Sequence, residues 1–183
     1  THSMIHPFGV TGFNLLTAKP VLFAANVSEE QLAKDDERLE ALKGYVRRGA
    51  SYLVKICGKT EAELLELSPE EQKEYLRGIA VEESGLSRVI RESFKLLDLI
   101  TFFTHNEKEL RAWTVPRGTK APQAAGKIHT DFERGFIRAE VTHYKDFIEC
   151  GGEHGARAKG HLRIEGKEYV VQDGDIIYFR FNV

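Results

Sequence analysis

The sequence predicts a two-part protein, in which an α/β unit of parallel strands and helices is followed by a small α+β domain of the β-grasp kind. Three observations predict it. A strand–helix–strand pattern occupies residues 20–57, helical periodicity continues from there to about residue 97, and short strands alternate with short helices after residue 99. We therefore expect the boundary between the parts near residues 96–99.

The first part begins with the run KPVLFAANV, which enters through Pro20 and is rich in strand formers. Its near-continuous hydrophobicity predicts a strand buried on both faces, and SYLVKIC at residues 51–57 predicts a second such strand. Between them, Ser28 is placed to cap one helix that would run to Arg48, with Gly49 after its end. A crossover of this kind normally joins parallel strands, whose carboxyl ends meet at one crevice.

The remaining elements are shorter. TEAELLELSPEEQKEYLRGI predicts two helices divided at Ser68 and Pro69, and GLSRVIRESFKLLDLI predicts a third. The apolar face expected on this third helix carries Leu86, Val89, Ile90, Phe94 and Leu97. Further on, LITFFT, ELRAWTV and FIRAEV predict strands, and APQAAGKIH and YKDFIEC predict helices. In KEYVVQDGDIIYFRFNV, an Asp-Gly turn between two strand-like runs predicts a closing hairpin.

Composition and charge exclude several classes of protein. The chain is 42% hydrophobic and 30% charged, and it has no apolar run of the roughly 18 residues that a membrane span needs. The start THSMIHPFGVTGF lacks the features of a secretory signal. Cys57 and Cys150 are far apart, which argues against a disulfide framework and favours a reducing cytoplasm. Residues 1–98 carry 13 basic and 16 acidic side chains and residues 99–183 carry 13 and 12, so charge alone does not predict nucleic-acid binding.

The end of the first strand carries polar groups that could read a nucleobase. In AANVSEE, Asn26 and Glu29 place an amide and a carboxylate where the strand opens into a loop. The same residues could simply end the strand and begin a helix. The loop CGK at residues 57–59 favours the functional interpretation, because Gly58 lets backbone approach a flat ligand.

A phosphate-binding loop is missing from the sequence. No Gly-x-x-x-x-Gly-Lys-Ser/Thr pattern occurs, and Gly58-Lys59-Thr60 lacks the first glycine at the required spacing. The chain is therefore expected to contact a nucleotide through its base only, without the groups that hold phosphate and Mg²⁺.

A basic segment between positions 117 and 138 is the candidate for contact with RNA phosphates. Its alternative is a solvated helix and loop whose charges balance one another. Phe132 and Phe136 could stack on bases, but they fit better as core residues beneath a helix. The proposed RNA-binding residues are Lys120, Lys127, His129, Arg134 and Arg138.

Metal binding and nucleophilic catalysis are not predicted. Four histidines, at positions 129, 143, 154 and 161, have spacings that match no compact ligand pattern. Neither Cys57 nor Cys150 stands in a Cys/His arrangement, so each is expected to be a buried or ordinary surface thiol. We name no catalytic residue and no metal ligand.

Two stretches of the chain resemble a known family. RAWTVPRGTKAPQAAGKIHTDFERGFIRAEV and the terminal DGDIIYFRFNV are similar to the TGS domain of the YchF/Obg-like ATPases, a branch of the Obg-related P-loop NTPases. KPVLFAANVSEE resembles their fourth guanine-nucleotide motif, with N-x-x-E in place of N-K-x-D. The likeness runs from about Asn14 to Val183, with residues 14–97 as the end of a P-loop G domain and 98–183 as the β-grasp TGS domain.

The resemblance implies roles for particular residues. Asn26, Val27 and Glu29 would contact the base of ATP or GTP, and Cys57, Gly58 and Lys59 would close over it as the fifth motif. In the family the glutamate is associated with acceptance of ATP. The TGS module is linked to RNA and the ribosome, which implies a cytoplasmic protein that contacts structured RNA and no membrane.

The sequence also departs from the family. The P-loop, both switch regions and the helical hairpin of the G domain are absent, so this chain is expected not to hydrolyse nucleotide by itself. Its sheet is expected to have an exposed edge or to pair with a partner. Residues 1–13 match the family poorly and are expected to be vector-derived or a divergent junction. The alternative function is a stand-alone RNA- or protein-binding module without a nucleotide role. The oligomeric state and the preference between ATP and GTP stay open.

Overall fold

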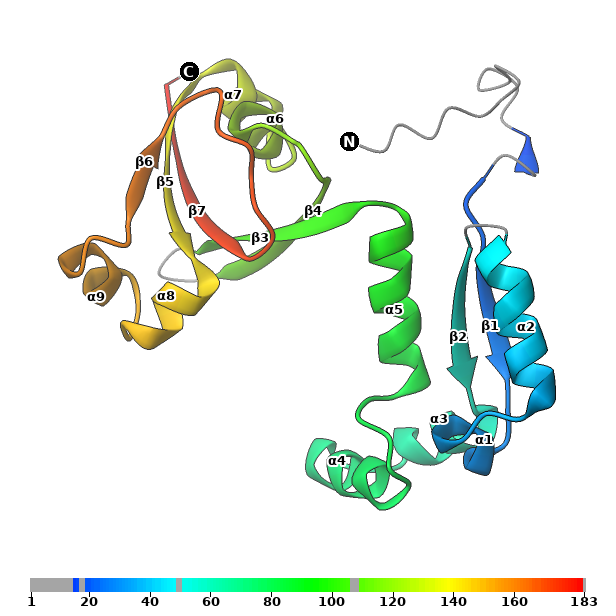
Figure 1. The fold of residues 1–183 in the computed structure, drawn as a ribbon. Helices are drawn as coiled ribbons and strands as arrows, with labels where there is room; N and C mark the ends of the chain where they lie inside the picture. The colour runs from blue at the N-terminus through cyan, green and yellow to red at the C-terminus, as the bar shows by residue number, and fades with distance from the viewer. Residues whose placement is uncertain (1–14, 17–18, 49–50, 106–108, 183) are drawn as a thin grey trace. The chain divides into compact units, whose positions relative to one another are not determined.

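The computed structural model describes residues 15–16, 19–48, 51–105 and 109–182 (Figure 1). The expectations for residues 1–13 and for Gly49 lie outside these ranges. The chain divides into two compact units, unit 1 at Thr1–Leu97 and unit 2 at Asp98–Val183.

Unit 1 is built on a pair of parallel strands. β1 (Leu22–Asn26) and β2 (Tyr52–Ile56) run side by side in register, with Asn26 opposite Ile56. The predicted parallel pairing is thus confirmed, and it brings the carboxyl ends of both strands to one edge. Helices α2 (Glu37–Arg48) and α5 (Gly85–Leu96) contact this sheet.

The prediction of one helix from Ser28 to Arg48 is wrong. The structure has α1 (Glu29–Ala33) and then α2, separated by an extended Lys34. The break is stabilised locally, because the Asp36 carboxylate accepts the backbone N–H of Leu39 at 2.9 Å and so caps α2.

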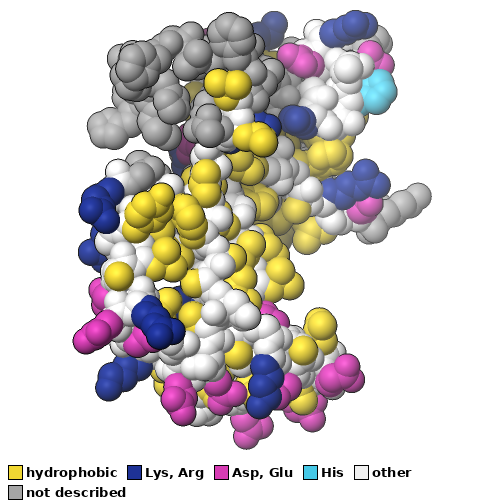
Figure 2. All heavy atoms as spheres, turned by 90° about the vertical axis from the view of Figure 1, so that its right-hand side faces the viewer, with side chains coloured by type: hydrophobic (Ala, Val, Ile, Leu, Met, Phe, Trp, Pro, Cys, Tyr) yellow, Lys and Arg dark blue, Asp and Glu magenta, His cyan; other side chains and the backbone are white. Residues whose placement is uncertain are grey.

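The prediction that both strands are buried on both faces is also wrong. None of the five residues of β1, all of which the structure describes, is buried, and in β2 Val54 alone is. Within the described residues each strand pairs only with the other, so each has an open edge, as expected from the missing neighbours. Figure 2 shows hydrophobic side chains exposed on the face of unit 1 that carries α2 and β1.

The later helices of unit 1 follow the prediction. α3 (Gly58–Leu65) and α4 (Pro69–Gly78) are separated at Ser68, which forms a capping box with Glu71. α5 has the expected amphipathic pattern, but its apolar face is incompletely covered, since Leu86 is 58% and Ile90 52% exposed.

Unit 2 contains a five-stranded mixed sheet in the order β4-β3-β7-β5-β6. β3 and β7 are parallel, and the other neighbours are antiparallel. Its strands are β3 (Leu99–His105), β4 (Leu110–Pro116), β5 (Phe136–His143), β6 (Arg163–Glu165) and β7 (Asp175–Phe181). Its helices are α6 (Ala121–Gly126), α7 (Thr130–Arg134), α8 (Tyr144–Glu149) and α9 (Glu153–Ala158).

A hydrophobic core fills one face of this sheet. Phe102 is fully buried and Ile177 is 1% exposed, and three alanines of α6 have no exposed surface. The small alanine side chains let α6 lie close to the strands, which explains the Ala-rich sequence of that helix.

The predicted closing hairpin is wrong. Val170 forms only an isolated bridge, with Lys120, while β7 enters the middle of the sheet between β3 and β5. The Asp-Gly turn is present, with Gly174 at a φ of +83°. The Asp173 carboxylate accepts the N–H of Thr101 at 2.8 Å, which directs the chain to β3 and not back along its own preceding run.

Candidate functional site

The two loops predicted to read a base meet in one pocket. It lies at the carboxyl ends of β1 and β2 and has a volume of about 520 Å³. The residues that line it are Asn26, Val27, Ser28, Glu29, Glu30, Cys57, Gly58 and Lys59.

Hydrogen bonds between the loops hold the floor of this pocket. The N–H of Val27 donates to the carbonyl of Ile56 at 2.8 Å, which extends the parallel pairing by one residue. The Asn26 Oδ1 accepts the N–H of Gly58 at 3.2 Å. With its oxygen engaged, Asn26 keeps the two N–H donors of its side chain for a ligand.

A tyrosine from α4 lies behind the pocket wall. The Tyr75 hydroxyl is 3.4 Å from Glu29 Oε2 and 2.5 Å from Glu63 Oε2, and Lys59 Nζ is 3.6 Å from Glu63 Oε1. The hydrogen bond to Glu63, followed by desolvation and the charge of Glu29, raises the pKa of Tyr75 to about 12. The hydroxyl therefore stays protonated and can donate to one of the two carboxylates at a time.

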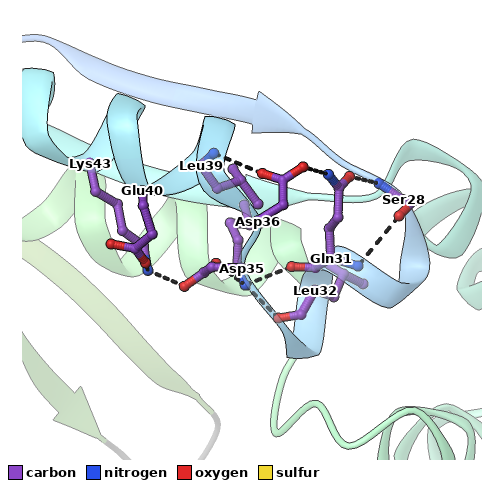
Figure 3. Close-up of polar contacts among 9 residues, drawn as sticks. Ser28, Gln31, Leu32, Asp35, Asp36, Leu39, Glu40 and Lys43 are labelled. Atoms are coloured by element: carbon purple, nitrogen blue, oxygen red, sulfur yellow. Dashed lines mark hydrogen bonds and ion pairs between the residues drawn. The ribbon is translucent and has the colours of Figure 1, made fainter.

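Figure 3 shows polar contacts between α1 and α2, including those of Asp36 with Gln31 and Leu39. Lys55 of β2 anchors α1, the helix that carries Glu29. Its ammonium group donates to the carbonyls of Gln31 at 2.7 Å and Leu32 at 2.6 Å, and to Asp35 Oδ1 at 3.0 Å. These carbonyls at the C-terminal end of α1 would otherwise lack partners. Lys43 holds the second oxygen of Asp35, and the two lysines lower the pKa of that carboxyl.

The sequence interpretation missed Tyr75 and Lys55. Tyr75 is 46 positions from Glu29 and has no local signal. The sequence did offer one signal for Lys55, which is a lone lysine inside an apolar strand run. A lysine in such a strand is expected to be largely buried, as Lys55 is at 16% exposed, and a buried lysine needs acceptors nearby.

Cys57 is one of the residues that line the pocket. The residue is 4% exposed and stands at the N-cap of α3, so of the two expected alternatives, a buried or an ordinary surface thiol, it is the buried one. Cys150 is partly buried, and both cysteines are free.

The proposed RNA-binding residues do not form one continuous surface. Lys120 is ion-paired with Glu168 at 2.5 Å, and His129 Nδ1 accepts the N–H of Asp131, which caps α7. Lys127 and Arg134 are exposed at the ends of α6 and α7.

Arg138 lies on the other face of the sheet. α6 and α7 cover the core face, toward which Ala139 and Val141 of β5 point. Because side chains alternate along a strand, Arg138 points to the opposite face. Phe136 is 5% exposed in the core and Phe132 packs against it, so both are core residues as expected.

In the part of the chain that the structure describes, no group of three or more His, Cys, Asp or Glu side chains could hold a metal ion. No helix in that part has the length and apolar character needed to cross a membrane.

Comparison with known proteins gives a family match within unit 2. Residues 99–182 match the family model YchF-GTPase_C, described as a protein of unknown function (DUF933). This match covers nearly all of unit 2 and none of unit 1.

Curated relatives match both the YchF-GTPase_C domain and unit 1. The chain is 48% identical over 176 residues to the ribosome-binding ATPase YchF of Bacillus subtilis (strain 168), covering 95% of this chain and 48% of the relative. It is 45% identical over 170 residues to the Obg-like ATPase 1 of Pongo abelii, covering 91% and 43%. The chain thus spans about half the length of the curated relatives it matches, and it is homologous to the C-terminal region of YchF proteins.

Solved structures show the same fold. The structure of the Schizosaccharomyces pombe YchF GTPase superposes with a TM-score of 0.80 at 38% identity, over 91% of this chain and 44% of that one. A GTP binding protein from Pyrococcus horikoshii OT3 gives a TM-score of 0.64 at 22% identity, over 90% and 46%, which is a likeness of fold alone. The chain therefore has an α/β fold that resembles YchF GTPase structures.

Proposed function

We propose that this chain supplies the base-recognition site and the ribosome-contacting module of a YchF-type protein that binds ATP or GTP. The observation that carries the proposal is the pocket at the ends of β1 and β2, where the amide of Asn26 and the carboxylate of Glu29 line the same hollow. The names of the relatives, which include a ribosome-binding ATPase and a GTPase, support the proposal of ATP or GTP as the nucleotide and of the ribosome as the partner.

The chemistry of the two side chains suits a purine. The free N–H groups of Asn26 can donate to N7, an acceptor that adenine and guanine share. Glu29 can accept from an exocyclic amine. An aspartate here would accept two neighbouring N–H donors of guanine, whereas the longer glutamate, held beside Tyr75 at 3.4 Å, loses that paired fit. This difference favours acceptance of ATP.

Hydrolysis is not assigned to this chain. Its sequence lacks the glycine-rich loop whose backbone and lysine hold phosphates and whose hydroxyl binds Mg²⁺. The residues present therefore do not fit a Mg²⁺ site of that kind, and we expect binding through the base without turnover.

For unit 2 we propose a β-grasp TGS module that contacts ribosomal or other structured RNA, in a cytoplasmic protein. The mixed sheet with α6 and α7 on its core face supports the β-grasp assignment. On that side, Lys127 and Arg134 are the exposed cations best placed for phosphate contact, and reversing both charges would weaken RNA binding.

The base site is tested by titrating ATP into the wild-type chain and into Asn26→Ala, with Asn182→Ala in unit 2 as the matched control. We expect weak ATP binding that Asn26→Ala abolishes and Asn182→Ala retains, with no Mg²⁺-dependent hydrolysis. Equal and negligible affinities for wild type and Asn26→Ala would instead favour a stand-alone RNA- or protein-binding module. Robust hydrolysis would refute the assignment of an incomplete site.

A further inference from the structure

Two arginines face each other on the outer face of the sheet in unit 2. Arg138 of β5 is the direct cross-strand partner of Arg180 of β7. Their neighbours Ala139 and Phe179 point into the core, so both arginines point away from it. Like charges at directly opposite positions destabilise a sheet, so this pair needs an anion nearby.

The sheet supplies one buried carboxylate for this purpose. Glu140, 7% exposed, accepts the Nε–H of Arg180 at 2.9 Å and an Nη2–H of Arg157 from α9 at 3.3 Å. Arg138 Nη2 is 3.6 Å from the same carboxylate, beyond hydrogen-bond distance. The hydrogen bond from Arg180, aided by the other two arginines, holds the pKa of Glu140 below its ordinary value, so the carboxylate is ionised.

The positive charge of the three arginines is not balanced by their partners. Arg157 also contacts Glu153 at 3.1 Å, so three guanidinium groups share two carboxylates and one positive charge is in excess. The three side chains are 48–55% exposed. Each guanidinium has five N–H donors in a planar fork that matches the oxygens of a phosphate, and the contacts within the cluster engage only a few of them.

An exposed aromatic ring adjoins these charges. Tyr178 is the cross-strand partner of Glu140 and is 44% exposed. The guanidinium carbon of Arg180 lies 4.3 Å from the centre of its ring. A stacked arginine–tyrosine pair beside further cations combines the two elements of a surface for single-stranded nucleic acid, charge for the backbone and a flat platform for a base.

We propose that this arginine cluster, Arg138, Arg157 and Arg180 around Glu140 with Tyr178 beside them, binds the phosphate backbone of single-stranded RNA. The inference rests on the RNA-binding part of the proposed function and goes beyond it, because it adds a second RNA contact on the sheet face opposite α6, α7, Lys127 and Arg134. It does not depend on the base pocket of unit 1.

The test uses Arg138→Gln, because Arg138 makes no hydrogen bond to Glu140 and its loss leaves that carboxylate partnered. Binding of a short fluorescein-labelled single-stranded RNA of mixed sequence is measured by anisotropy over a range of salt. We expect affinity to fall about three- to tenfold at low salt and the slope of log K against log salt to shrink by about 0.7, the value for one phosphate contact. The melting temperature should stay unchanged or rise, because the arginine pair is relieved.

Controls separate the outcomes. Arg117→Gln, which removes an arginine of unit 2 that is 60% exposed and paired with Asp98, should leave RNA binding unchanged. Tyr178→Ala should weaken binding of RNA but not of heparin, which has no bases; equal loss of both would refute the stacking role. If Arg138→Gln binds RNA as tightly as the wild type but melts at a lower temperature, the arginine cluster has only a structural role. That result would overturn the proposal.

Two further results would also overturn it. In the first, charge reversal of Lys127 and Arg134 abolishes RNA binding while Arg138→Gln keeps the wild-type affinity. Unit 2 would then bind RNA, but not through the arginine cluster. In the second, the wild-type chain does not bind RNA at all. The ATP titration of Asn26→Ala would still test the base site independently.

Discussion

Among the described residues, unit 2 has a hydrophobic core cluster of twelve buried residues, whereas the core cluster of unit 1 has only five. Phe102 and Val115 in unit 2 have no exposed surface, but Leu86 and Ile90 on α5 of unit 1 are each more than half exposed. A five-stranded sheet offers one broad face for a core, while two strands alone are marginal. We infer that the geometry of the pocket in unit 1 depends more on individual polar contacts than on a hydrophobic core.

Truncating the core of unit 2 should have the largest effect. Phe102→Ala is expected to cost about 3–5 kcal/mol in free energy of unfolding, because a fully buried ring leaves a cavity. Ile90→Ala in unit 1 should cost within about 0.5 kcal/mol, as for other exposed positions. Urea unfolding followed by fluorescence of Trp113, the sole tryptophan, reports on unit 2, and circular dichroism reports on both units. Similar costs for the two variants would remove the contrast between the units.

Removing Lys55 should have an intermediate effect, confined to unit 1. Lys55→Met leaves two helix-end carbonyls without their donor and Asp35 with Lys43 alone, which is expected to cost about 1–3 kcal/mol and to weaken ATP binding by freeing α1. Lys43→Met is the matched control, because Lys43 contacts Asp35 but no carbonyl of α1. Its cost should be below about 1 kcal/mol, with ATP binding retained. Equal losses of ATP affinity in both variants would show that the charge of Asp35 matters and the anchoring of α1 does not.

Acid should have the smallest effect, and it should act on both units. The pKa of Asp35 in unit 1 lies below its ordinary value of 3.8, and that of Glu140 in unit 2 lies below 4.5. A carboxyl whose pKa is lower in the folded state than in the unfolded state stabilises the fold at pH values above its unfolded-state pKa. This stabilisation is lost as the pH falls through the folded-state pKa. Unfolding free energy measured between neutral pH and pH 3 should therefore fall in the acid range, and Glu140→Gln should flatten the fall for unit 2 alone. An unaltered profile in that variant would contradict the role of Glu140.

The pocket at the ends of β1 and β2 was the part of the site that sequence could predict. Parallel strands bring their carboxyl ends to one edge, so Asn26 and Gly58 could be placed together from the strand–helix–strand pattern alone. Ser68 and Pro69 likewise predicted the start of α4, because a cap and a first-turn proline are local signals.

Other features escaped prediction, either because a local signal was ambiguous or because the deciding contacts join distant residues. The break after α1 depends on the Asp36 side chain capping α2, in a polar run that is equally compatible with one helix. The insertion of β7 between β3 and β5 depends on the whole sheet, and the Asp-Gly turn alone favoured a hairpin. The pairing of Arg138 with Arg180 follows from that insertion and from a register shift between Phe136 and Arg138, which no sequence period reveals.

We propose above that the ends of β1 and β2 bind a purine through its base. The most direct test of this proposal follows backbone amide signals of the isotopically labelled chain by NMR while adenosine, which has no phosphate, is added. The account predicts saturable shifts at residues 26–30 and 57–59, and their loss in Asn26→Ala. Shifts that appear with ATP but not with adenosine, or that fall only in unit 2, would contradict it.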